Sequence, residues 1–211
     1  MKFSVPLNVA YAFLFLTNVL SPSALASNVD SDHSLKTQEA RMHAKALGVA
    51  LQAKLKQAIQ SGGLEEGVNA CHLAAEPIAT VLSVEGWTVG RTALKVRNPN
   101  NSPDAWEQTQ LTMFAEQLAK SVELPNETGE TPSLKKPFEA TFFDKESNKF
   151  RYMMAIETKP VCIACHGSDI SPTVKEVIDT HYPNDQATGF DIGSLRGAFT
   201  LTYTESQSTL N

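Results

Sequence analysis

The residues with the clearest chemistry are two cysteines and a histidine in the run Cys162-Ile163-Ala164-Cys165-His166. Two thiols three residues apart can each add to one vinyl group of the same porphyrin, and the adjacent imidazole is then placed to ligate the iron. This spacing is the attachment signature of a c-type haem, and it rarely arises by chance in a chain with three cysteines and five histidines. The motif therefore predicts one covalently held haem, with His166 as an iron ligand.

Three other kinds of site use the same residue types. A thioredoxin-type redox pair has the same cysteine spacing, but it needs no trailing histidine and belongs in a βαβ unit. A zinc site built from Cys71, Cys162, Cys165 and His166 has the right number of ligands but lacks a second closely spaced pair. A disulfide between Cys162 and Cys165 fits an oxidising compartment. Among the four interpretations, the haem site accounts for every residue of the motif.

The motif leaves the other axial ligand of the iron open. No Met follows His166, which excludes the pattern of small mitochondrial-type cytochromes, whose ligand Met lies far downstream. The candidates are Cys71, His72, Met153, Met154 and His181. Met153 and Met154 fall on a predicted strand and His181 precedes a turn, where core and surface roles are more common. Cys71 falls mid-way along the apolar face of a predicted helix, so the residues alone leave it open between an iron ligand and a buried core residue.

A basic cluster of Arg91, Lys95 and Arg97 precedes the turn-rich segment 97–104, RNPNNSPD. A haem has two propionates, and arginine pairs with carboxylates in a bidentate geometry. Arg91 and Arg97 are therefore candidates for propionate contacts. The alternative interpretation is a solvated basic face.

The N-terminus has the features of a secretory signal peptide. Lys2 is followed by an apolar run from Val5 to Leu20 and by small residues at Ala24 and Ala26. The run is shorter than the roughly 18 residues needed to cross a bilayer, although an uncleaved anchor is the alternative. We expect cleavage after Ala26, export to the periplasm, and a mature chain without a membrane span.

Composition predicts one ordinary globular domain over 27–211, after a signal peptide over 1–26. The chain has 211 residues, of which 42% are hydrophobic and 19% charged. Its net charge of −5 argues against nucleic acid and anionic membrane surfaces as partners. Three cysteines are an odd number, which excludes a fully paired disulfide framework.

Hydrophobic periodicity predicts two long helices before the motif. Leu47, Leu51, Leu55 and Ile59 recur every four residues. They predict a helix over 35–60 that ends at Ser61-Gly62-Gly63. A second helix over 64–82 carries Cys71 on its apolar face. Pro77 is expected to kink or split this second helix.

Most of the remaining chain has strand and turn patterns. We expect strands at 87–91, 138–143, 149–158 and 198–203, helices at 105–122 and 173–180, and a polar loop at 123–136. Phe150, Tyr152, Met154 and Ile156 alternate along one strand, so one face of it should be buried. Helices at the front and antiparallel strands behind them indicate an α+β domain.

Several runs together carry a family resemblance. They are Asn69-Ala70-Cys71, the segment 89–107 (VGRTALKVRNPNNSPDAWE), the haem motif with Gly167, the segment 182–190 (YPNDQATGF), and Arg196-Gly197-Ala198-Phe199. In these runs residues 27–211 resemble a family of exported proteins with a single c-type haem in a PAS-like domain. The resemblance implies a PAS-like antiparallel sheet with two long N-terminal helices. It also implies His166 and Cys71 as axial ligands, and it makes the loop with Arg91 and Arg97 part of the haem pocket.

These observations favour a binding protein over an enzyme. The first hypothesis is a haem-based sensor of redox state or of a small gas, in which Cys71 is a switchable ligand and a separate protein receives the signal. Electron transfer between periplasmic redox proteins is the alternative. A small haem peroxidase would need an open iron site and an acid–base group, and the sequence shows no convincing distal His–Arg pair.

Overall fold

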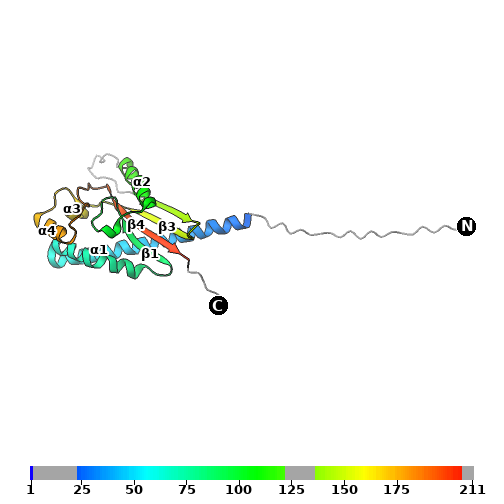
Figure 1. Cartoon of the computed structure of the whole chain (residues 1–211), viewed down its shortest axis with the longest axis horizontal. Helices are drawn as coiled ribbons and strands as arrows, with labels where there is room; N and C mark the ends of the chain where they lie inside the picture. Colours follow the sequence, from blue (N-terminus) through cyan, green and yellow to red (C-terminus); the bar gives the residue numbers. More distant parts are fainter. Residues whose placement is uncertain (2–22, 122–135, 206–211) are drawn as a thin grey trace. The chain divides into compact units, whose positions relative to one another are not determined.

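The structure is a computed structural model that describes Met1 and residues 23–121 and 136–205, with side chains, apart from that of Met1, described only from residue 32 onward. Met1–Ser34 and Leu35–Asn211 form two compact units, and every strand lies in the second. In chain order the elements are α1 (Ser23–Leu82), β1 (Trp87–Thr92), the 3₁₀ helix η1 (Pro99–Asn101), α2 (Ala105–Ser121), β2 (Glu139–Asp144), β3 (Lys149–Glu157), α3 (Pro160–His166), α4 (Pro172–His181) and β4 (Leu195–Thr204), as labelled in Figure 1.

Helix α1 consists of two helical segments that meet at a glycine pair. Gly62 and Gly63 have non-helical backbone angles, and Gly63 has a φ of 78°, which favours glycine. The two predicted helices and the break between them are confirmed. The second segment continues through Pro77, so the expected split is wrong, while a kink there stays a prediction. Pro77 lies on the exposed side of the helix, where the backbone carbonyl that loses its hydrogen-bond donor can face water.

The sheet has four antiparallel strands in the order β1-β4-β3-β2. Strands β2 and β3 form the predicted hairpin, and the last strand lies between β1 and β3. Arg91 is paired with Phe199, and Ile156 with Gly197. The end of β1, the end of β3 and the start of β4 therefore meet at one end of the sheet. The loop after β1 and helix α3 after β3 both begin there.

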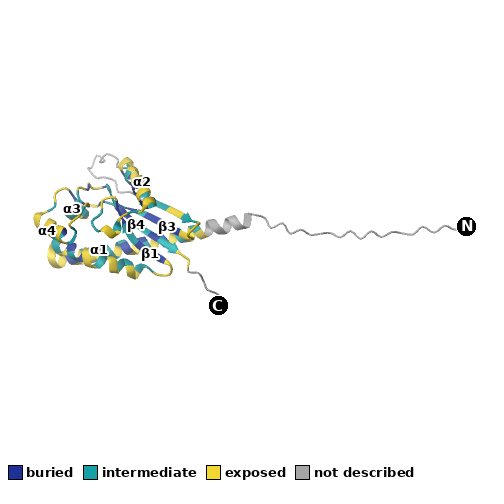
Figure 2. Cartoon of the chain, in the orientation of Figure 1, coloured by how far each residue is buried: buried dark blue, intermediate teal, exposed yellow. Residues whose placement is uncertain are grey.

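Helices cover both faces of the sheet (Figure 1). On one face Ala40, Ala44 and Leu47 of α1 pack against Trp87, Val89, Phe150, Tyr152 and Leu201. On the other face Leu111 and Phe114 of α2 pack against Met153, Ala155 and Ala198. The buried residues accordingly follow the strands between the two helical layers in Figure 2. The expectation of one buried face for β3 is incomplete, because α2 adds a second apolar layer.

Helix α4 attaches the motif region to the second segment of α1. Its residues Val174 and Ile178 pack against Val68, and Cys165 is partly buried against this cluster. The predicted short helix at 173–180 is present and is one residue longer at each end. The predicted helix at 105–122 is present over Ala105–Ser121, and residue 122 lies outside the described residues. The fold class is confirmed as α+β, with a PAS-like antiparallel sheet and two long N-terminal helices.

Two predicted segments fall mainly on residues outside the described part of the chain. They are the signal peptide over 1–26 and the polar loop over 123–136. Within the described residues, no helix combines the length and the apolar character that crossing a membrane requires.

Candidate functional site

A cavity of about 250 Å³ lies at the end of the sheet where β1, β3 and β4 meet. Its walls come from both segments of α1, from the loop after β1, from α3 and from the start of β4. Apolar side chains form much of the lining, among them Leu51, Leu55, Ile59, Val68 and Phe199. All three cysteines of the chain and His166 also line it. The cavity thus brings together residues that are almost 100 positions apart in the sequence.

The motif forms the short helix α3, which sequence reasoning did not predict. Pro160 is its first residue, where the fixed φ of proline suits a helix start and the missing N–H has no cost. Cys162 and Cys165 are three residues apart on this helix and so share one face, which lines the cavity. The Lys159 backbone N–H donates to Cys162 Sγ over 3.4 Å. The cysteine spacing therefore presents both thiols to the same space.

Gly167 ends α3 directly after His166. A Cβ atom at this position would lie 2.6 Å from Ile163 Cγ2 and 2.7 Å from the Ile163 carbonyl oxygen, so only glycine fits. The loop before β4 pairs with this helix end, because Gly189 N donates to Gly167 O and Phe190 N donates to His166 O. These backbone bonds hold the loop against the histidine.

One hydrogen bond fixes the tautomer of His166. Its Nδ1 lies 2.7 Å from the Ala187 carbonyl oxygen, which can only accept, so Nδ1 carries the proton. Nε2 is then the unprotonated nitrogen, whose lone pair accepts from Arg196 Nη2 at 3.4 Å, and an unprotonated Nε2 is the arrangement found in metal-ligating histidines. Burial lowers the pKa of His166 to about 2, and the positive charges of Arg196 and Arg97 add to this effect. The imidazole is therefore neutral and able to act as a ligand at physiological pH.

Cys71, on the second segment of α1, lines the cavity and is exposed, whereas the sequence predicted a buried position on the helix face. The apolar face of this helix borders the cavity at Cys71, which leaves the thiol accessible. Burial raises the pKa of the Cys71 thiol, and the positive charges of Arg91 and Arg97 oppose that rise. A thiolate at this position therefore needs further positive charge, such as a metal ion, to be stable.

The other candidates for the second axial ligand are not among the residues that line the cavity. Met153 is fully buried on the α2 side of the sheet, and Met154 packs into the core against α1. His72 stacks on His181 with ring centroids 4.3 Å apart. His181 Nε2 lies 2.8 Å from Asn69 Oδ1. Of the five candidates, Cys71 alone shares the cavity with His166.

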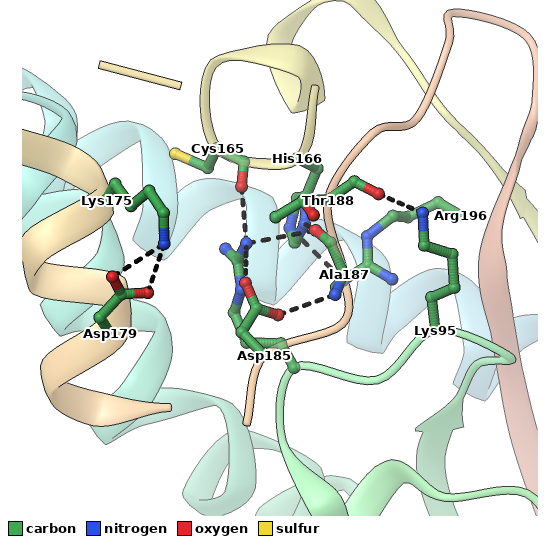
Figure 3. A network of polar contacts seen from close by, with 10 residues as sticks. Lys95, Cys165, His166, Lys175, Asp179, Asp185, Ala187, Thr188 and Arg196 are labelled. Atoms are coloured by element: carbon green, nitrogen blue, oxygen red, sulfur yellow. Dashed lines mark hydrogen bonds and ion pairs between the residues drawn. The ribbon is translucent and has the colours of Figure 1, made fainter. Parts of the chain in front are cut away.

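Arg97 lines the cavity, but its guanidinium contacts protein groups. Its Nη2 donates to the Cys165 carbonyl oxygen at 2.6 Å, to Asp185 Oδ2 at 2.9 Å and to the Ala187 carbonyl oxygen at 3.2 Å. Figure 3 shows Cys165, Asp185, Ala187 and His166 converging at this point from the motif helix and the loop before β4. Through these hydrogen bonds Arg97 ties the motif helix to the loop before β4. A propionate contact of Arg97 stays a prediction.

Arg91 and Arg196 are the cavity cations that form no ion pair with a carboxylate among the described residues. Burial lowers the pKa of both guanidinium groups, that of Arg196 to about 10. Arg196 Nη2 lies 3.4 Å from His166 Nε2, and its guanidinium stacks over the Phe190 ring. Sequence reasoning did not select Arg196 as a site residue, although the run 196–199 belongs to the family resemblance. Two half-buried cations without carboxylate partners among the described residues are suited to an anionic ligand.

The donor set fits a c-type haem. Two thiols on one helix face, a neutral imidazole with an unprotonated Nε2, a third thiol from α1 and two arginines without carboxylate partners among the described residues line the cavity. Within the described residues, no group of three or more His, Cys, Asp or Glu side chains could hold a metal ion by itself.

Comparison with known proteins identifies the family. The family model described as Tll0287-like matches residues 24–203, so the chain belongs to the Tll0287-like family, which confirms the resemblance seen in the sequence. No curated protein matches the chain. One similar solved structure is that of the cyanobacterial haem protein Tll0287, with 25% sequence identity and a TM-score of 0.47, over 76% of this chain and 94% of that chain.

Proposed function

We propose that this chain, as a member of the Tll0287-like family, holds one c-type haem in the cavity and acts as a haem-based sensor in the periplasm. The observation that carries the proposal is the convergence of Cys162, Cys165, His166 and Cys71 on one apolar cavity. The protein that gives the family its name is described as a haem protein. Both lines of support agree with the motif chemistry.

The motif cysteines supply the covalent attachment. Each thiol would add across one vinyl group of the haem, with a carbon–sulfur bond formed and the thiol hydrogen passed to the other vinyl carbon, without net oxidation or reduction. Their common face on α3 directs both sulfur atoms into the same cavity. A covalently held cofactor cannot dissociate after export, which suits the predicted signal peptide.

In this proposal His166, through Nε2, and Cys71, through Sγ, would ligate the haem iron. The bound iron would supply redox chemistry and an affinity for small gaseous ligands. The Ala187 carbonyl orients His166 and keeps Nε2 unprotonated. Cys71 comes from a different helix and has no hydrogen bond to its sulfur among the described residues. Arg91 and Arg196 would balance the propionate charges.

A sensing role is supported by the different attachment of the two ligands. Hydrogen bonds from the loop before β4 fix His166 and the end of α3. Cys71 lies on the second segment of α1, beyond the glycine pair at 62–63. The end of this segment packs on the sheet through Ile78, Ala79 and Leu82. Release of Cys71 from the iron would loosen the stretch between the glycine pair and this packed end, which is the kind of two-state element a sensor requires.

Absorption spectra of the purified chain test both the cofactor and the role. The proposal predicts a low-spin haem spectrum when oxidised, and loss of one axial ligand on reduction with binding of carbon monoxide or nitric oxide. A six-coordinate spectrum in both oxidation states, with no gas binding, would replace sensing by electron transfer. Turnover with peroxide would support an enzyme instead. A spectrum without haem would overturn the proposal.

A further inference from the structure

A buried ion pair lies directly behind the proposed iron ligand. Arg97 and Asp185 are 88 positions apart, and their side chains are only 12% and 5% exposed. Asp185 Oδ2 accepts from Arg97 Nη2 at 2.9 Å, while its Oδ1 accepts from the Ala187 backbone N–H at 2.8 Å. One carboxylate therefore holds both the guanidinium and the residue that orients His166.

The Ala187 carbonyl oxygen accepts two hydrogen bonds. His166 Nδ1 donates to it at 2.7 Å, and Arg97 Nη2 donates to it at 3.2 Å. A second, charged donor draws electron density from the oxygen, so the oxygen accepts less strongly from the imidazole. The carbonyl position does not depend on Arg97 alone, because backbone bonds hold its loop at Gln186, Gly189 and Phe190.

We propose that Arg97, held in place by Asp185, is a positioning residue that sets the donor strength of His166 by competing for the Ala187 carbonyl oxygen. The inference rests on the proposed function, since His166 must be an iron ligand for the effect to reach the iron. The hydrogen bond from the non-ligating nitrogen of a metal-bound histidine governs how strongly the ring donates to the metal. A weaker bond to Ala187 means weaker donation to oxidised iron and a higher reduction potential.

The contacts need the length of arginine as well as its charge. Nη2, at the tip of the guanidinium, has two hydrogens that are shared among the Cys165 carbonyl, the Asp185 carboxylate and the Ala187 carbonyl. A lysine ammonium ends one bond closer to the backbone, so it falls short of the Ala187 carbonyl. Arg97→Lys therefore retains the positive charge while it removes the competing donor, and Arg97→Gln removes both.

The test compares these two variants with wild type in the haem-loaded chain. We expect both variants to lower the reduction potential. For Arg97→Lys we expect about a tenfold change in the redox equilibrium constant, which corresponds to a potential lower by about 59 mV for one electron. For Arg97→Gln we expect a larger decrease, because this variant loses the positive charge as well as the donor. The electron paramagnetic resonance g-values of the oxidised form should shift in both. Lys175→Gln is the matched control, because it removes a cation from an exposed ion pair on α4 and should leave both readouts unchanged.

The outcomes separate the inference from the proposed function. An Arg97→Lys variant with the wild-type potential and g-values overturns the inference, whether or not Arg97→Gln shifts them, because charge or stability alone would then explain Arg97. A wild-type chain without covalent haem overturns the proposed function and this inference with it.

A variant that fails to acquire haem is tested in the haem-free chain by NMR. The Nδ1 proton of His166 should move downfield in Arg97→Lys as its bond to Ala187 strengthens. An unchanged shift overturns the inference.

Discussion

Nδ1 of His166 lies 2.7 Å from the carbonyl oxygen of Ala187, a residue 21 positions later in the chain. This hydrogen bond decides which nitrogen of the ring is available to a metal. The neutral imidazole has one N–H group, and that group donates to the carbonyl oxygen, so the other nitrogen keeps its lone pair. The loop before β4 is thus part of the site and does more than connect α4 with β4. Helix α3 positions the thiols, while the loop orients the ring.

Replacement of Cys71 by Ala should change the iron coordination. In the proposed site its sulfur is the second axial ligand, so Cys71→Ala should shift the Soret band of the oxidised chain and leave the haem covalently attached. His72→Ala is the matched control, since His72 stacks on His181 and is not among the residues that line the cavity. Absorption spectra of both variants check this. An unchanged Cys71→Ala spectrum, or the same shift in His72→Ala, would contradict the assignment.

Gly167→Ala should damage the end of the motif helix. Its Cβ would lie 2.7 Å from the backbone oxygen of Ile163, which cannot rotate away, so we expect a loss of about 1–3 kcal/mol in unfolding free energy. Covalent haem content should fall as well, because the displaced segment carries His166. At Gly90 the nearest contact is 3.8 Å, so Gly90→Ala should have little effect. Urea unfolding and haem staining measure the two effects, and equal stabilities for both variants would refute this account of Gly167.

Asp185→Asn should be strongly destabilising. It leaves the Arg97 charge buried without its counter-charge, and breaking a buried pair in this way costs about 3–5 kcal/mol. Asp179→Asn removes the same charge from the exposed pair with Lys175, where a loss below about 1 kcal/mol is expected. Chemical denaturation of the two variants provides the comparison. Similar losses in both would mean that the Arg97–Asp185 pair does not hold the loop.

Much of the fold could be predicted from local patterns in the sequence. The period of four in α1, the glycine pair that breaks it and the alternation in β3 are all properties of neighbouring residues. The motif and its cavity-facing thiols also follow from short spacing. Burial of the second face of β3 was harder to predict. Alternation shows which residues point the same way, but it does not show whether a helix such as α2 covers the other side.

The electrostatic part of the site could not be predicted in the same way. Arg97 was selected for its charge, but its partner Asp185 lies 88 positions later and the pairing depends on the tertiary fold. Arg196 reaches the cavity because β4 lies between β1 and β3. A Cβ at Gly197 would lie 2.6 Å from the Thr92 carbonyl oxygen, which shows how closely these strands approach. Cys71 is accessible only because a cavity adjoins its helix.

Arg91→Gln should have opposite effects with and without haem. In the haem-free Cys162→Ala/Cys165→Ala chain, Arg91 is a half-buried cation without a carboxylate partner among the described residues, so its removal should stabilise the fold by up to about 1 kcal/mol. In the haem-loaded chain the same change removes a propionate partner and should destabilise it. Lys54→Gln, at an exposed position on α1, should change neither form. Thermal unfolding of the four samples tests this, and a stabilising effect in both forms would contradict a propionate contact.

The central claim is a haem attached through Cys162 and Cys165, and the most direct measurement is haem staining of a denaturing gel. Wild-type chain exported to the periplasm should give a stained band at the size of the chain cleaved after Ala26. Cys162→Ala/Cys165→Ala should give the same protein band without stain. A stained band that persists in the double variant, or its absence from wild type, would contradict the account.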